Sequence, residues 1–143
     1  MLKYGLAEKN ELTGNDIGIS IGHNDTDNVM RENIVADSKQ VGILFRNDAR
    51  GKNFWANRNT VVKNQILNSG AANGVAIDIT GRTSDLVIKE NLISEQRQPM
   101  QRTGIRIGPE AGKIELADNK IEGFMKSIDD QRQQSGGKIE SIG

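Results

Sequence analysis

Cysteine is absent from this 143-residue chain, and histidine and tryptophan occur once each. Without cysteine the chain has no disulfides and no thiolate metal sites, and a single histidine cannot build a histidine-rich metal centre. The lack of cysteine does not by itself decide whether a protein is secreted. Aromatic residues make up 3% of the chain, so any core must be aliphatic.

Net charge and long apolar runs are missing as well. Lysine plus arginine and aspartate plus glutamate number 19 each, so the formal net charge is zero. Such a balance gives no general attraction to nucleic acid or to an anionic membrane. No apolar run approaches the roughly 20 residues of a membrane span, and residues 1–6 lack the apolar core of a signal peptide. We therefore expect neither nucleic acid nor a membrane span.

Proline occurs only twice, and the 16 glycines show no collagen period, so linker and collagen classes are excluded. The chain consists instead of short alternating runs. Residues 74–79 alternate apolar and other residues, Leu86 and Ile88 share one face of a second short run, and Ile93 follows Asn91. Alternation with a period of two is typical of a strand with one buried face. We interpret this unit as three short strands, with Asn91 as a one-residue corner between the second and the third.

Asparagine recurs at this corner five times. Each copy has an apolar residue three positions before it and another two positions after it, and successive copies are 23, 31, 27 and 28 residues apart. A period of this size indicates a solenoid. Asparagine tolerates left-handed backbone, and stacked amides bond one another in ladders. That asparagine is simply a common turn residue is the alternative, but it leaves the constant flanking register unexplained. The predicted ladder is Asn10, Asn33, Asn64, Asn91 and Asn119.

Asn-x-Ile corners that alternate with Gly-Ile-x-Ile strands resemble the right-handed parallel β-helix of the pectin lyase-like superfamily. The resemblance covers nearly the whole chain. It implies an all-β fold, a single-stranded right-handed parallel β-helix of about five rungs, with residues 1–143 as one domain. It also implies that the glycine-led strands form the first sheet, along which enzymes of the superfamily commonly bind their substrates. These strands begin at Gly18, Gly42, Gly74 and Gly104.

The two ends of the chain depart from the repeat. We expect residues 1–12 to form an incomplete first rung and residues 123–143 an irregular C-terminal cap, with one edge strand at 138–142. Superfamily enzymes usually start with a helical cap and have more rungs. We therefore expect a fragment or C-terminal portion that lacks an N-terminal segment, or a chain that associates end to end with itself, because open rungs leave strand edges unpaired. The resemblance favours an extracellular or cell-surface location.

Ionisable residues gather on the glycine-led strands. Alignment on the glycines makes Arg46 and Asp78 neighbours on adjacent rungs, with Arg106 diagonal to Asp78 and His23 close by. A lyase of acidic sugars needs a cation for the carboxylate and a base for the adjacent proton. Arg46 or Arg106 suits the first role, His23 suits the second, and Asp78 suits calcium binding. These four residues are the catalytic candidates. A surface ion pair across strands is the alternative.

The longest insertion, residues 46–58, carries the only tryptophan. Trp55 has the chemistry to stack on a sugar ring, which would make it a substrate-binding residue together with Arg46 and Arg106. The alternative is that Phe54 and Trp55 pin the insertion onto the body of the protein. A second insertion, residues 94–103, is polar, and we expect it to be mobile.

A polar corner at residues 22–28 holds Asp25 and Asp27. Two closely spaced carboxylates are compatible with a calcium-binding loop, although the glycine and distal glutamate of the helix-loop-helix pattern are missing. The alternative is a solvated turn with side-chain-to-backbone hydrogen bonds. We predict no metal site and no cofactor, with calcium as the alternative.

Two classes of function follow from these patterns. The first is a carbohydrate-associated β-helix protein, a lyase or epimerase acting on acidic polysaccharide, and it rests on the resemblance. The second is a non-catalytic binding or assembly module, as in surface and tailspike proteins. Whether the chain is an enzyme stays open, and polysaccharide is the partner expected from the first class.

Overall fold

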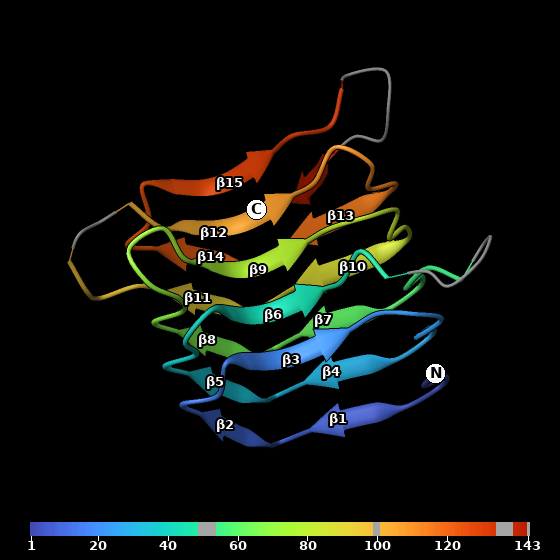
Figure 1. The fold of residues 1–143 in the computed structure, drawn as a ribbon, viewed down its shortest axis with the longest axis horizontal. Helices are drawn as coiled ribbons and strands as arrows, with labels where there is room; N and C mark the ends of the chain where they lie inside the picture. Colours follow the sequence, from blue (N-terminus) through green and yellow to red (C-terminus); the bar gives the residue numbers. More distant parts are fainter. Residues whose placement is uncertain (49–53, 99–100, 134–138, 143) are drawn as a thin grey trace.

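The computed structural model describes residues 1–48, 54–98, 101–133 and 139–142, the last four by their backbone alone. These residues form sixteen strands of three to five residues and no helix. The strands wind upwards as successive rungs, and the strands of each sheet are stacked above one another (Figure 1). No helix that could cross a membrane occurs in this part of the chain.

Five rungs contain three strands each, and one further strand follows them. The first rung is β1 (Leu6–Glu8), β2 (Glu11–Thr13) and β3 (Ile17–Ile21), and the second is β4 (Val29–Arg31), β5 (Ile34–Ala36) and β6 (Val41–Phe45). The third is β7 (Thr60–Val62), β8 (Gln65–Leu67) and β9 (Val75–Ile79), and the fourth is β10 (Leu86–Lys89), β11 (Leu92–Ser94) and β12 (Thr103–Ile107). The fifth is β13 (Ile114–Ala117), β14 (Lys120–Glu122) and β15 (Lys126–Asp130), before β16 (Ile139–Ile142).

All pairing is parallel and joins each strand to its counterparts in the neighbouring rungs. Sheet A has the order β15-β12-β9-β6-β3, sheet B the order β1-β4-β7-β10-β13-β16, and sheet C the order β14-β11-β8-β5-β2. The predicted all-β parallel β-helix of about five rungs is confirmed. Two of the predicted site residues, Asp78 and Arg106, lie on sheet A, the sheet of the glycine-led strands, and His23, Arg46 and Trp55 lie in the corners that follow its strands.

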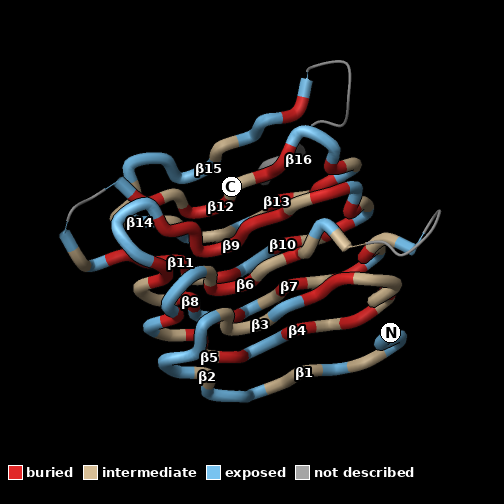
Figure 2. The backbone as a smooth tube through the Cα atoms, in the orientation of Figure 1, coloured by how far each residue is buried: buried red, intermediate tan, exposed pale blue. Residues whose placement is uncertain are grey.

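The apolar residues that flank each asparagine corner point into the solenoid. On sheet B, Met30, Val61 and Ile88 are Cα partners in consecutive rungs, and on sheet C the partners Val35, Ile66 and Ile93 are fully buried. Figure 2 shows this burial along the middle rungs and its decline towards β1 and β2. Each fully buried aliphatic side chain stabilises the fold by about 1.5–3 kcal/mol. The core is aliphatic as predicted, with Phe45 its one fully buried aromatic residue among those described.

The asparagine ladder is present with every amide in the predicted order. In the first four asparagines the side-chain Nδ2 donates to the Oδ1 of the next one, at 2.9–3.1 Å. Asn64 shows the full set: its Nδ2 also donates to the Met30 carbonyl at 3.0 Å, and its Oδ1 accepts from both nitrogens of Asn33. Aspartate has no Nδ2 donor, so the buried amide explains why asparagine is needed here.

The corner differs in one respect from the sequence interpretation. It contains two residues, and the left-handed backbone lies on the residue before the asparagine, at φ near 55°. The interpretation of asparagine as a one-residue left-handed corner was therefore wrong. Asparagine supplies the inward amide, and an exposed charged residue supplies the turn. These turn residues are Lys9, Glu32, Lys63, Glu90 and Asp118.

A second, shorter ladder precedes sheet B and was not predicted. The backbone nitrogen of Gly5 donates to Asn28 Oδ1 at 2.7 Å, and the backbone nitrogen of Asn28 donates to Asn59 Oδ1 at 3.0 Å. Both side chains are buried. Asn28 and Asn59 stand five residues before Asn33 and Asn64, so the same spacing in the sequence was the signal for it.

The C-terminal segment is more regular than expected. Residues 126–130 form β15 and extend sheet A, and residues 139–142 form β16 and pair with β13. The description of residues 123–143 as an irregular cap was therefore wrong, whereas the edge strand expected at 138–142 is present. Lys126–Asp130 is largely polar, so backbone pairing rather than apolar alternation holds it in the sheet. Residues 1–12 contain β1 and β2, both paired to the second rung.

Candidate functional site

The register of sheet A decides which candidate residues meet. Asp78 of β9 is the Cα partner of Leu44 on one side and of Arg106 on the other. The prediction that Arg46 lies beside Asp78 was wrong, and so was the diagonal placement of Arg106. A slip of two residues keeps the same side chains on each face, so alternation cannot reveal it.

The predicted register was wrong by two residues because it aligned Gly74 with Gly42. Val75 pairs with Val41, which puts Ala76 rather than Gly74 at the level of Gly42. A Cβ at Gly42 would lie 2.7 Å from Ile66 Cγ2, so this level tolerates only a small inward residue. Ala76 meets that condition and is 1% exposed, in contrast to its predicted place on the outer face.

Asp78 and Arg106 form a two-point ion pair across adjacent strands. Arg106 Nη2 donates to Asp78 Oδ2 at 2.6 Å and its Nε donates to Oδ1 at 3.1 Å. The Asp78 side chain is 7% exposed and the Arg106 side chain 39%. Hydrogen bonding to Asp78 raises the pKa of Arg106, partial burial opposes this, and the charges of Asp78 and Asp129 add to the rise. The guanidinium is therefore a fixed cation.

A groove of about 320 Å³ opens beside this pair. It lies where β9, β12 and β15 end and their corners begin, and the corner after β6 supplies one further wall. Thr80, in the corner after β9, is held by a hydrogen bond from its hydroxyl to the Phe45 carbonyl, at 2.6 Å. The polar lining residues are Asn47, Asp78, Thr80, Arg106, Glu110 and Gln131.

Trp55 lies next to the groove. A Cβ added at Gly81, a lining residue, would lie 2.6 Å from Trp55 Cζ3, so the indole packs directly on this glycine. Gly81 also has a φ of 71°, which glycine adopts without strain. The ring thus rests on the body of the protein at the groove wall, and its position is compatible with both predicted roles. Residues 49–53 of the same insertion lie outside the described residues.

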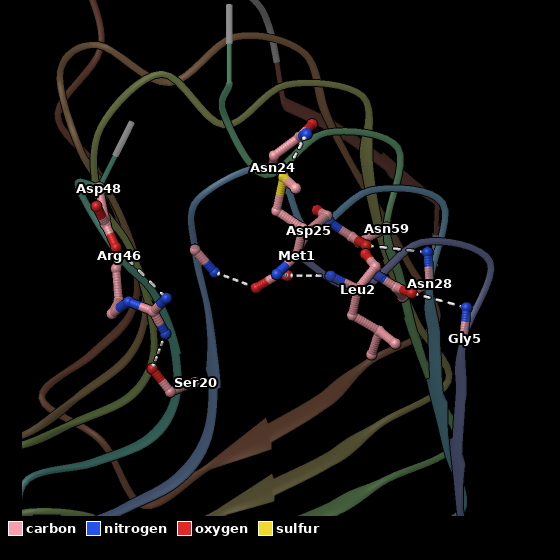
Figure 3. Close-up of polar contacts among 11 residues, drawn as sticks. Met1, Leu2, Gly5, Ser20, Asn24, Asp25, Asn28, Arg46, Asp48 and Asn59 are labelled. Atoms are coloured by element: carbon pink, nitrogen blue, oxygen red, sulfur yellow. Dashed lines mark hydrogen bonds and ion pairs between the residues drawn. The ribbon is translucent and has the colours of Figure 1, made fainter. Parts of the chain in front are cut away.

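Arg46 and His23 do not line the groove. Arg46 Nη1 donates to Ser20 Oγ at 2.6 Å, and its Nη2 lies 3.5 Å from Asp48 Oδ2 (Figure 3). The His23 ring is tilted against the Phe54 ring, with 5.4 Å between centroids. Of the four predicted catalytic residues, the structure brings together Asp78 and Arg106 at the groove and places Arg46 and His23 at the neighbouring corners.

The two aspartates considered for calcium have other partners. Asp25 accepts hydrogen bonds from the backbone nitrogens of Leu2 at 2.7 Å and Gly22 at 2.8 Å (Figure 3). Asp27 is held by Arg58 at 2.9 and 3.1 Å, and these hydrogen bonds lower the pKa of Asp27. Within the part of the chain that the structure describes, no three histidine, aspartate or glutamate side chains gather as a metal site would require.

A buried charge cluster was missed in the sequence. Glu95, whose side chain is fully buried, accepts hydrogen bonds from the backbone and side chain of Arg97 at 2.9–3.0 Å, and Arg102 Nε lies 3.3 Å away. Burial raises the pKa of Glu95, but hydrogen bonds from Arg97 and the charges of Arg97 and Arg102 outweigh it, so the pKa is lowered. The insertion expected to be mobile therefore has an anchored start at Glu95.

Asn47, Glu110 and Gln131 were also missed as groove residues. They lie beyond strand ends rather than on strands, so the alternation that guided the search did not include them. Only the three-dimensional closure of the rungs brings the corner after β6 close to those after β12 and β15.

No match was found among curated proteins or among solved structures. A family model described as "Right handed beta helix region" matches residues 8–137, which is most of the chain and includes the whole asparagine ladder. The match agrees with the three parallel sheets and with the right hand that the resemblance implied. The chain belongs to the right-handed β-helix family.

Proposed function

We propose that this protein is a carbohydrate-binding β-helix module, and that the groove beside the Asp78–Arg106 pair is its contact surface. The family match supports a carbohydrate-associated protein. The observation that carries the proposal is the groove itself, where fixed charges, exposed amides and an adjacent indole converge.

The chemistry of the lining suits sugar hydroxyls. A hydroxyl both donates and accepts, so it needs neighbours of both kinds. Asn47 and Gln131 provide exposed amides with donor and acceptor atoms, and the Asp78 carboxylate is an acceptor held in one orientation by Arg106. A group that is already fixed loses little conformational entropy when a ligand binds. Few precisely placed polar groups in a concave site are typical of small-molecule recognition.

The geometry supports binding more directly than lyase or epimerase chemistry. A general base must come within about 3 Å of the proton that it removes. His23, the predicted base, lies against Phe54, and the raised pKa of Arg106 keeps that residue protonated. The titratable groove residues that remain are Asp78, which is paired with Arg106, and Glu110, which lies 3.4 Å from Arg82.

Calorimetric titration with a panel of oligosaccharides tests the proposal. Asn47→Ala and Gln131→Ala should each weaken binding by about 5- to 30-fold, equivalent to about 1–2 kcal/mol, without lowering the melting temperature. Gln65→Ala is the matched control, because it removes an exposed amide on sheet C. Ultraviolet detection of unsaturated product in the same mixtures reports any lyase activity. The proposal fails if no saccharide binds, or if the groove variants bind as tightly as Gln65→Ala.

A further inference from the structure

We infer that the groove selects saccharides without carboxylate groups, either uncharged or amine-bearing, and disfavours the acidic polysaccharides expected from the sequence. This inference rests on the proposed function and adds the class of ligand. It follows from the carboxylate partners of the arginines that the structure describes near the groove: Arg46, Arg82 and Arg106.

Among the described residues that line the groove, Arg106 is the one cation, and it lies between two carboxylates. Asp78 and Asp129 are its Cα partners on the two flanking strands of sheet A. Asp78 occupies two guanidinium nitrogens, at 2.6 and 3.1 Å. A ligand carboxylate could take these nitrogens only by leaving the buried Asp78 charge without its partner, which is strongly unfavourable.

The other charges that the structure describes around the groove have partners of their own. Glu110 adds a second lining carboxylate, and its partner Arg82 is 68% exposed at 3.4 Å, so solvent screens that pair. Asp129 has Lys126 at 3.9 Å and accepts a hydrogen bond from Gln131 at 3.2 Å. The described lining residues therefore hold two carboxylates against one guanidinium, so their own summed charge is negative.

Arg46, the other cation predicted to bind an acidic sugar, does not supply the missing charge. Its guanidinium lies over Gly22, where an added Cβ would be 2.2 Å from Nη2, and its partners are Ser20 and Asp48. The groove thus offers acceptors and amides to hydroxyl or ammonium groups, and it offers repulsion to a chain of uronates.

Three hexasaccharides matched in length test the inference on the intact protein: a neutral one, a glucosamine one and a uronate one. We expect the neutral or the glucosamine hexamer to bind wild type at least 10-fold more tightly than the uronate hexamer. Raising the salt concentration from 50 to 500 mM should strengthen uronate binding, because screening weakens repulsion, and should leave the neutral ligand unchanged.

Two surface substitutions make the test specific. The double variant Asp129→Asn, Glu110→Gln should raise the ratio of uronate affinity to neutral affinity at least 5-fold over that of wild type. Glu115→Gln on sheet B is the control and should change neither. Uronate binding to wild type that equals neutral binding and weakens with salt would overturn the inference but keep the proposed function. Absence of binding by all three ligands would remove both.

Discussion

A single amide type at five equivalent positions holds the rungs in register. Asn91 is 2% exposed, and its Oδ1 accepts hydrogen bonds from the backbone and side chain of Asn64 at 2.9 and 3.1 Å. Its Nδ2 donates to the Val61 carbonyl at 3.0 Å and to Asn119 Oδ1 at 2.9 Å. No donor or acceptor of this side chain is left unused, so its loss affects the rungs on both sides.

We predict that Asn91→Ala lowers the free energy of unfolding by about 1–3 kcal/mol, because it removes the hydrogen-bond partner of two Asn64 nitrogens and of the Val61 carbonyl. Asn73→Ala removes an exposed amide outside the ladder and should stay within about 0.5 kcal/mol of wild type. Denaturant melts monitored by Trp55 fluorescence measure both. Similar losses for the two variants would show that the ladder is not a major source of stability.

At the residue scale the sequence predicts which asparagines form the ladder, but it does not predict the backbone conformation of their corners. The position of each ladder asparagine follows from apolar residues at fixed offsets, and those offsets reflect core packing. The sequence gives no comparable signal for the left-handed residue before each asparagine. Lys9, Glu32 and Asp118 have in common only that they are exposed and ionisable. Their side chains point to solvent, where chemical identity is weakly constrained.

Single strands are short here, and the elements between them carry the charged clusters. The segment after β11 begins with Glu95, whose buried carboxylate pairs with Arg97 and Arg102. Arg97 also donates to the Gly70 carbonyl, and Arg102 donates to the Ala71 carbonyl, both in the rung below. This cluster ties the corner between sheets C and A to the preceding rung.

We predict that this cluster makes stability dependent on acidic pH. The pKa of Glu95 is lowered from its ordinary value of 4.5. A lowered pKa contributes stability above the unfolded value, and that stability is lost as the pH falls through the folded value. Glu95→Gln should therefore destabilise by about 1–3 kcal/mol at pH 7, and its difference from wild type should shrink towards pH 3.

Glu90→Gln is the control, since Glu90 forms an exposed pair with Lys63 at 3.8 Å. Its melting temperature should run parallel to that of wild type from pH 3 to pH 7. Thermal melts in a series of buffers measure all three proteins. A constant difference between Glu95→Gln and wild type over this range would contradict the assignment.

Alternation in the sequence located the strands of sheet A but not their register. Gly74 precedes Val75 much as Gly42 precedes Ile43, so the sequence alone aligns the two glycines. The structure aligns Gly42 with Ala76 because the inward space at that level accepts either small residue. In the observed register Arg106 is the strand partner of Asp78, and Arg46 is not. The candidate site therefore contains one arginine where the sequence predicted two.

At the scale of the whole molecule, both ends of the described solenoid expose apolar side chains. Leu2 and Leu6 are each 57% exposed at the first rung, and Met125 is 67% exposed next to β15. β14 and β15 are the outermost strands of sheets C and A, but on sheet B the position beyond β13 is occupied by β16. A second copy whose β2 and β3 extend sheets C and A would bring its β1 to the place of β16.

We predict that β16 limits the end-to-end association expected from the sequence. A chain ending at Gln133 lacks β16 and offers three unoccupied edges in one plane, so it should self-associate at micromolar concentration. The full chain should associate at least 10-fold more weakly under the same conditions. Sedimentation velocity over a concentration series compares them. Equal association of both chains would show that β16 does not control the ends.

The hydrogen-bond distances in the asparagine ladder do not depend on the lengths of the segments between the strands. The amide distances stay at 2.9–3.1 Å although successive asparagines are 23 to 31 residues apart. The corner between sheets B and C always has two residues, whereas the segments from sheet A to sheet B range from six to fourteen. Those segments border the groove. New recognition loops can therefore be grafted between Arg46 and Asn59, or diverge there in evolution, while the amide stack keeps the frame unchanged.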